Sequence, residues 1–134
     1  MGLKMPERVI VGECVVREGC QHEEHFIPTE AKIWLLNRII TAGFKKVEVT
    51  SLSNPRYVPQ FRDAEEVLKK IERKQGVTYT VVAVSSYAVN KAVECCNAGY
   101  GPTEIGAMIS TSESHNRSNT GKFSNGLFEL CREW

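Results

Sequence analysis

Stretches typical of buried strands alternate with stretches typical of helices along this chain, and that alternation limits the folds it can adopt. A nearly continuous apolar run at residues 9–16 predicts a buried strand. Further strands are expected at residues 46–50, 78–84 and 104–109, the third being rich in Val and Thr. Four strand–helix units with short connections predict a parallel sheet with right-handed crossovers.

The first expected helix shows the clearest periodicity. Ile33, Leu36 and Ile40 recur at helical spacing, so one face of this segment is apolar. Thr29 is a plausible N-cap, and Gly43 can supply the left-handed residue that ends the helix. We therefore expect this helix to pack on the sheet through its apolar face.

Capping patterns mark two more helices. Asp63 and Glu66 have the spacing of a capping box, and the helix that they open is expected to end at Gly76. Ser85 or Ser86 is expected to cap the third helix. The sequence therefore predicts one helix after each of the first three strands.

The remainder is expected to be a polar loop, residues 110–122, followed by an amphipathic stretch, residues 123–134. Two architectures fit the whole pattern, a small doubly wound sheet or part of a (βα)8 barrel. Because a barrel needs about 250 residues, four units correspond to half of one. We expect a single α/β domain over residues 1–134, a parallel (βα)4 unit equivalent to the N-terminal half of a TIM barrel without its C-terminal half.

Composition excludes several classes of function. A formal net charge of +1 gives no indication of nucleic acid or of an acidic membrane surface as a partner. No apolar run approaches the roughly 20 residues of a membrane span, and residues 1–7 do not resemble a secretory signal. The five cysteines are odd in number and include no Cys-x-x-Cys pair, which favours a reducing, intracellular environment.

An arginine and a glutamate are adjacent where the first strand is expected to end, at Arg17 and Glu18. In a β/α barrel the C-terminal ends of the strands bear the chemistry. A carboxylate there can hold a divalent cation, and an arginine can stabilise an enolate. The alternative is a surface ion pair that contributes little. His22 and His25 form a His-x-x-His pattern, but no third zinc ligand is evident.

Ordered stretches throughout the chain resemble the hydroxymethylglutaryl-CoA lyase branch of the metal-dependent aldolase and lyase barrels. They are residues 27–33, 36–40, 42–51, 55–60, 63–68 and 110–114, together with Asn119. The resemblance implies a (βα)8 barrel that cleaves a carbon–carbon bond in a 3-hydroxyacyl-CoA, giving acetyl-CoA and a keto acid. It also implies a divalent cation, Mg²⁺ or Mn²⁺, that polarises oxygens of the substrate.

The resemblance also implies roles for individual residues. Arg17 would stabilise the enolate, Glu18 would bind the metal, and Glu48 would orient the catalytic groups. Polar pocket positions near the substrate would be Gln21, Ser51, Ser112 and Asn119. An ion pair with Arg17 explains Glu48 as well, because an unpaired carboxylate among apolar neighbours is costly. Ser112 and Asn119 can equally be loop-capping residues.

The chain departs from the family's pattern at three places. Glu18 replaces the aspartate of the family's Arg-Asp-Gly, and the longer side chain suits the strict octahedral geometry of Mg²⁺ poorly. Glu24 stands where the lyases have a lysine. The family's His-x-His ligand pair, its asparagine ligand and its later catalytic cysteine have no counterpart, and Cys131 is not that cysteine.

These departures leave the assignment as an enzyme open. One hypothesis is a lyase segment, inactive as an isolated chain. The other is a non-catalytic half barrel that acts by self-association or acyl-CoA binding; a fragment of a related claisen-type acyltransferase is a third possibility. A half barrel leaves two strand edges exposed, so we expect a homo-oligomer or pairing with another barrel half. The expected location is the cytoplasm or the mitochondrial matrix.

Overall fold

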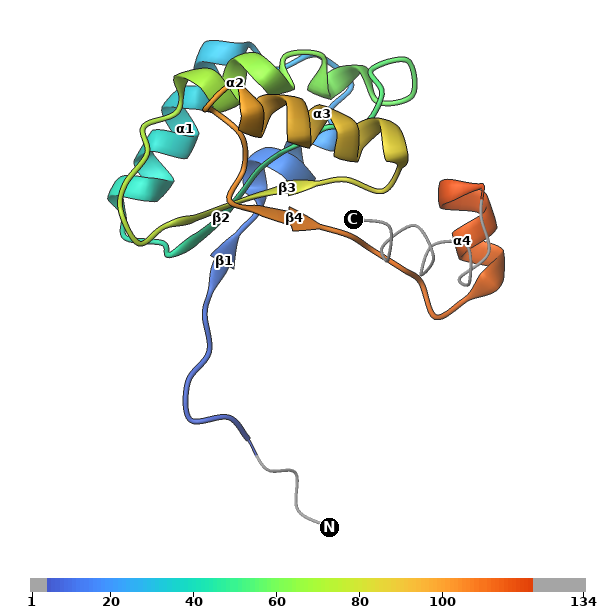
Figure 1. Cartoon of the computed structure of the whole chain (residues 1–134), viewed down its shortest axis with the longest axis horizontal. Helices are drawn as coiled ribbons and strands as arrows, with labels where there is room; N and C mark the ends of the chain where they lie inside the picture. Colours follow the sequence, from blue (N-terminus) through green and yellow to red (C-terminus); the bar gives the residue numbers. More distant parts are fainter. Residues whose placement is uncertain (1–4, 122–134) are drawn as a thin grey trace.

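A computed structural model describes residues 5–121, and within this range four parallel strands form one sheet in the order β1-β2-β3-β4 (Figure 1). The strands are β1 (Gly12–Glu13), β2 (Lys46–Ser51), β3 (Thr78–Val82) and β4 (Glu104–Gly106). Gly12 is opposite Lys46 in the sheet, and Thr80 is opposite Glu104. The predicted parallel arrangement of four strands is confirmed.

Helices α1 (Thr29–Thr41), α2 (Ala64–Lys70) and α3 (Ser86–Asn97) cover the same face of the sheet (Figure 1). Helix α4 (Glu113–Thr120) lies apart from them, beyond the end of β4. A doubly wound sheet would have helices on both faces. The one-sided arrangement therefore identifies part of a β/α barrel, with the helices outside and the other face of the sheet toward the barrel interior.

The hydrophobic core fills the space between the sheet and α1 to α3. Leu36 of α1 and Leu68 of α2 are fully buried there, together with Val47 and Val49 of β2. Because side chains alternate along a strand, Glu48 between these valines points to the opposite face. The packing of β2 on its helices thus directs Glu48 toward the barrel interior.

The first strand is much shorter than predicted. Strand β1 spans Gly12–Glu13, whereas Val9, Ile10 and Val11 are 75%, 76% and 65% exposed. Strand β1 pairs only with β2, so no described strand covers its other edge. The prediction of a buried strand over residues 9–16 was wrong because apolar composition predicts burial only where a neighbouring strand is present.

Two helix boundaries also differ from prediction. Pro28, not Thr29, is the N-cap of α1. Helix α2 ends at Lys70, well before Gly76, because Ile71 has an extended backbone with φ −64° and ψ 142°. The expected end of α1 is confirmed, since Gly43 adopts the left-handed region with φ 101°.

The capping predictions had mixed outcomes. Asp63 is at the N-cap of α2 but makes no capping hydrogen bond. Its carboxylate instead accepts a hydrogen bond from Lys32 at 2.8 Å, so the capping-box prediction was wrong. Ser85 does cap α3, accepting a hydrogen bond from the backbone N–H of Ala88 at 3.3 Å.

The last part of the described chain contains a helix where a loop was expected. Helix α4 begins after Ser112 as N-cap and is followed by Gly121, which has φ 72°. Strand β4 ends at Gly106 instead of continuing to residue 109. The predicted amphipathic stretch 123–134 lies outside the described residues. None of the helices within residues 5–121 combines the length and apolar character that a membrane crossing needs.

Candidate functional site

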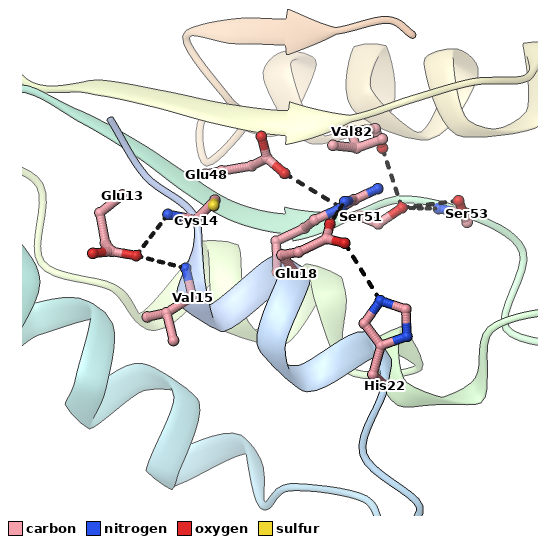
Figure 2. Close-up of polar contacts among 10 residues, drawn as sticks. Glu13, Cys14, Val15, Glu18, His22, Glu48, Ser51, Ser53 and Val82 are labelled. Carbon is pink, nitrogen blue, oxygen red and sulfur yellow. Dashed lines mark hydrogen bonds and ion pairs between the residues drawn. The ribbon is translucent and has the colours of Figure 1, made fainter. Parts of the chain in front are cut away.

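A π-helical turn, Val15–Gly19, follows β1 and contains the predicted site residues Arg17 and Glu18. The Glu13 carboxylate begins this turn by accepting hydrogen bonds from the backbone N–H groups of Cys14 and Val15, both at 2.8 Å (Figure 2). Short π-helical turns are rare and often occur at functional sites. Here the turn places both charges at the C-terminal end of the strand.

The Arg17 guanidinium lies between two carboxylates. The residue is only 8% exposed, and its Nη1 forms an ion pair with Glu18. Its Nε lies 3.3 Å from Oε1 of Glu48 but has no hydrogen-bond partner among the described residues. The guanidinium is therefore buried and paired in charge, but its hydrogen-bonding capacity is incompletely used.

Glu48 is held in a partly desolvated position. Burial, and to a smaller extent the negative charge of Glu18, raise the pKa of Glu48, although the positive charges of Arg17 and Lys46 oppose this shift. A β-bulge follows immediately, since Glu48 pairs with Thr80 whereas Thr50 already pairs with Val81. Bulges redirect side chains and occur often beside active sites.

The Glu18 carboxylate is half-exposed and has a contact at each oxygen. Oε2 pairs with Arg17, and Oε1 lies 3.4 Å from Nε2 of His22, one helical turn later (Figure 2). His22 is itself mostly exposed. Because each carboxylate oxygen has a second lone pair, the half-exposed Glu18 can still accept a ligand beside these two contacts.

A cleft of about 570 Å³ opens beside the two charges. Four predicted site residues border it, namely Arg17, Glu18, Gln21 and Asn119. Its remaining lining residues are Ala107, Met108, Ile109, Ser110, His115 and Asn116. The fold thus brings the π-helical turn and α4, which are far apart in sequence, to the same cleft.

Ser51 and Ser112 are not among the residues that line this cleft. The buried Ser51 hydroxyl shares a hydrogen bond with Ser53 at 2.8 Å and donates to the carbonyl of Val82 at 3.3 Å (Figure 2). Ser112 accepts a hydrogen bond from the backbone N–H of His115 at 3.4 Å. In this structure both hydroxyls serve local backbone geometry.

Sequence reasoning predicted Asn119 of α4 at the pocket but missed the helix itself and its buried Asn116. Asn116 is buried, accepts a hydrogen bond from the backbone N–H of Ser110 at 2.8 Å, and donates to its carbonyl at 2.9 Å. These bonds hold α4 against the segment that joins it to β4. The available signal was a serine N-cap at residue 112 and a glycine stop at residue 121, which together indicate a short helix.

A buried ion pair behind the site was also missed. Lys32 of α1 donates to Oδ1 of Asp63 at 2.8 Å and to the carbonyl of Gln60 at 2.6 Å. The Gln60 side chain in turn donates to the carbonyl of Glu23 at 3.0 Å. This cluster ties the loop that follows the π-helical turn to α1 and α2. The signal was a lysine within the apolar stripe of α1.

The described residues do not form a metal centre by themselves. Across residues 5–121, no three His, Cys, Asp or Glu side chains are grouped so that they could hold a metal ion. Glu18 offers one carboxylate at the cleft, and both of its oxygens already have partners. A cation at this place would need most of its ligands from outside the described residues.

The fold and site together define part of a β/α barrel, with charged groups at the C-terminal ends of the strands. A comparison with protein-family models finds no match. The chain is 33% identical over 128 residues to a hydroxymethylglutaryl-CoA lyase of Bacillus subtilis. This match covers 96% of the chain and 41% of the relative. It is 36% identical over 115 residues to the human cytoplasmic 3-hydroxy-3-methylglutaryl-CoA lyase, and this match covers 86% of the chain and 30% of the relative.

Solved structures agree with these matches. The crystal structure of the Bacillus subtilis HMG-CoA lyase superposes with a TM-score of 0.86 at 32% identity, over 98% of this chain and 42% of that one. A structure of an Acinetobacter baumannii HMG-CoA lyase in complex with coenzyme A and 3-methylmalate also superposes, with a TM-score of 0.81 at 31% identity. The superposition covers 90% of this chain and 38% of that one. The chain belongs to the hydroxymethylglutaryl-CoA lyase family and spans less than half the length of these relatives.

Proposed function

We propose that this chain supplies the N-terminal part of a lyase active site that cleaves a carbon–carbon bond in a 3-hydroxyacyl-CoA such as hydroxymethylglutaryl-CoA. The products would be acetyl-CoA and a keto acid. The observation that supports this most directly is the buried Arg17, placed at a strand end between Glu18 and Glu48 and open to the cleft. A buried cation facing a cleft is suited to an anionic intermediate.

In this proposal Arg17 stabilises the enolate that forms when the carbon–carbon bond breaks. Its side chain borders the cleft, where a guanidinium N–H group can donate to an anionic oxygen. Glu48 acts as a positioning residue, because its carboxylate lies 3.3 Å from the Arg17 Nε and limits the orientation of the guanidinium.

Polar side chains around the cleft would contact the substrate. Gln21 and Asn119 line the cleft, and their amides can both donate and accept hydrogen bonds. Ser51 and Ser112 would act less directly, through the bonds they make here. Ser51 links the ends of β2 and β3, and Ser112 caps the helix that bears Asn119.

A divalent cation, Mg²⁺ or Mn²⁺, would supply Lewis-acid polarisation of a substrate oxygen when bound. Glu18 would contribute one oxygen ligand, and the other ligands would come from outside residues 5–121. Replacement of aspartate by the longer glutamate favours the more adaptable Mn²⁺ over Mg²⁺. The described residues would therefore provide one ligand of such a metal site.

The proposal also concerns the domain organisation of the chain, the class of its ligand and its cellular location. Residues 1–134 would form a single half-barrel domain. The ligand would be an acyl-CoA, a class suggested by the coenzyme A bound to the Acinetobacter baumannii relative. Relatives are named as cytoplasmic or mitochondrial, so an intracellular location in one of these compartments is proposed.

Ligand binding tests the proposal without requiring turnover. Calorimetry with hydroxymethylglutaryl-CoA and Mn²⁺ should detect binding to this chain, and Arg17→Met should weaken it by at least about tenfold, or roughly 1.4 kcal/mol. Arg38→Met is the matched control, because Arg38 is an exposed cation on α1 that packs against Trp34. Equal binding by wild type and Arg17→Met, or none by wild type, would reject the proposed site.

Turnover is a separate measurement. We expect no lyase activity from this chain alone with either cation, because one carboxylate cannot replace a complete metal shell. A Glu18→Asp variant should bind Mg²⁺ more tightly than wild type while remaining inactive. Clear turnover that Arg17→Ala abolishes would show that the described residues suffice for catalysis.

A second candidate function is association without catalysis. It is not favoured, because the relatives that the chain matches are lyases. A claisen-type acyltransferase is not favoured, because the relatives reported above are lyases.

A further inference from the structure

Glu13 is a charged residue beside the site that the proposed chemistry does not use. It is the last residue of β1, and its Oε1 accepts hydrogen bonds from the backbone N–H groups of Cys14 and Val15, each at 2.8 Å (Figure 2). Hydrogen bonds from N–H groups to a carboxylate are charge-assisted and stronger than those between neutral groups. The Glu13 side chain is therefore held by the segment that follows it.

The two N–H groups lie where the π-helical turn has no acceptors of its own. The first N–H groups of a helix lack partners within it, and Cys14, the N-cap of this turn, makes no capping bond with its side chain. Glu13 supplies the acceptor from one residue before the N-cap. Its negative charge also suits the N-terminal end of a helical turn.

The capped backbone leads directly to the two charged residues of the site. The carbonyl of Cys14 accepts hydrogen bonds from the backbone N–H groups of Arg17 at 3.0 Å and of Glu18 at 2.7 Å. The N–H group of Cys14 is bound by Glu13, and its carbonyl is bound by the turn. The backbone at Cys14 therefore connects the Glu13 carboxylate to the placement of both charges.

Glu13 is also fixed relative to the strand that contains Glu48. In the sheet, Glu13 is opposite Val47, which is fully buried and immediately precedes Glu48. The backbone of Glu13 is thus tied to β2, and its side chain is tied to the turn that bears Arg17. Together these contacts set the approach of the Arg17 Nε to Oε1 of Glu48, which is 3.3 Å.

The contribution of Glu13 is local. Both capping bonds are exposed to solvent, so water can replace the carboxylate when it is removed. Val16 within the turn is 2% exposed and packs in the hydrophobic core independently of Glu13. Removal of the carboxylate should therefore loosen the backbone of the turn without unfolding the protein.

We propose that Glu13 is a positioning residue, whose carboxylate fixes the π-helical turn so that Arg17 stays beside Glu48 and at the border of the cleft. Glu13 contacts no ligand in this role and acts only through Arg17. The placement of Arg17 follows from the geometry of the turn, whereas its consequence for acyl-CoA binding rests on the proposed function.

Exchange of the Arg17 Nε proton with water tests the placement of this side chain without a ligand. The Nε atom is buried in the folded protein, and its NMR signal can be assigned by its absence from Arg17→Met. Glu13→Ala should accelerate the exchange by at least about tenfold, because the lost bonds are charge-assisted. Glu13→Gln should stay within about twofold of wild type, since an amide oxygen can accept the same two bonds.

Ser85→Ala is the matched control. It removes the hydroxyl that caps α3, a helix that does not border the cleft. The urea midpoint of this variant should also fall, but exchange at Arg17 should stay unchanged. Circular dichroism checks helix content, and Glu13→Val, with a residue suited to a strand, replaces Glu13→Ala if that variant does not fold. Unchanged exchange without the carboxylate, or equal acceleration in Glu13→Gln or Ser85→Ala, would overturn the proposal.

Ligand binding separates this proposal from the proposed function. In calorimetry with hydroxymethylglutaryl-CoA and Mn²⁺, Glu13→Ala should weaken binding by about tenfold, and Glu13→Gln should bind nearly as wild type does. Absence of binding by the wild-type chain rejects the proposed function, while the proton exchange of Arg17 still decides the role of Glu13. Binding that requires Arg17 but is unchanged in Glu13→Ala would overturn the positioning role.

Discussion

Two buried cations in this chain have the same charge and opposite surroundings. Lys32 is 3% exposed and makes two short hydrogen bonds, to Asp63 at 2.8 Å and to the Gln60 carbonyl at 2.6 Å. Arg17 is 8% exposed, has an Nε that lies 3.3 Å from Glu48 without a hydrogen bond, and borders the 570 Å³ cleft. One cation is enclosed between helices, and the other faces open space.

The difference distinguishes a buried cation that stabilises the fold from one that can bind a ligand. A buried charge enclosed by its own partners is not placed to meet a ligand, and removing its partner destabilises the fold. A buried charge that borders a cleft can interact with a ligand, and its loss should affect binding more than folding. We therefore assign Lys32 to stability and Arg17 to function, and the following changes should separate them.

The largest effect on stability is expected at the enclosed pair. Asp63→Ala leaves Lys32 buried without its carboxylate and should lower the free energy of unfolding by about 3–5 kcal/mol. Urea unfolding monitored by circular dichroism measures this change. Glu66→Ala, which removes an exposed partner of Lys70, is the control and should have little effect. Similar losses in the two variants would contradict the assignment of Lys32.

A smaller loss of stability is expected at the site. Arg17→Met should lower the free energy of unfolding by about 1–2 kcal/mol, because Glu48 loses a partner but stays partly solvated. The same variant should lose acyl-CoA binding, whereas Lys32→Met should reduce stability more and leave binding intact in the protein that remains folded. A lower free energy of unfolding for Arg17→Met than for Lys32→Met would contradict the assignment of Lys32 to stability and Arg17 to function.

The smallest expected effect is on the pH dependence of stability. Because the folded state raises the pKa of Glu48, the contribution of this group is greatest at low pH and is lost as pH rises through the folded pKa. Glu48→Gln should remove that fall in unfolding free energy, measured in urea at a series of pH values. Glu104→Gln should act in the opposite direction, because Lys46 lowers the pKa of Glu104 and its contribution is lost as pH falls. Equal pH profiles in the two variants would contradict both assignments.

Much of the fold could be predicted because it depends on local periodicity. The spacing of Ile33, Leu36 and Ile40 predicted α1, and the Val-rich run at residues 78–84 predicted β3. Helical and strand patterns repeat over a few residues, so they can be recognised without knowledge of what packs against them. The position of Arg17 and Glu18 after the first strand could be predicted for the same reason.

Local patterns failed where the outcome depended on a distant neighbour. Asp63 follows the rules for a helix cap, but Lys32, 31 residues earlier, offers its carboxylate a stronger buried partner. The segment that contains α4 is too polar to show an apolar face, so its helix was not expected, although Asn119 within it was predicted at the pocket. The bulge after Glu48 depends on the register with β3 and has no signature in β2 alone.

The sequence by itself determined the alternation of strands and helices, the parallel sheet, the family and the adjacency of Arg17 and Glu18. Tertiary structure alone decided that Val9, Ile10 and Val11 stay exposed, that Lys32 is enclosed by Asp63 and Gln60, and that Arg17 borders a cleft. The physical reason is that backbone preferences act between near neighbours in sequence. Burial and charge pairing are set by whichever elements come together in space.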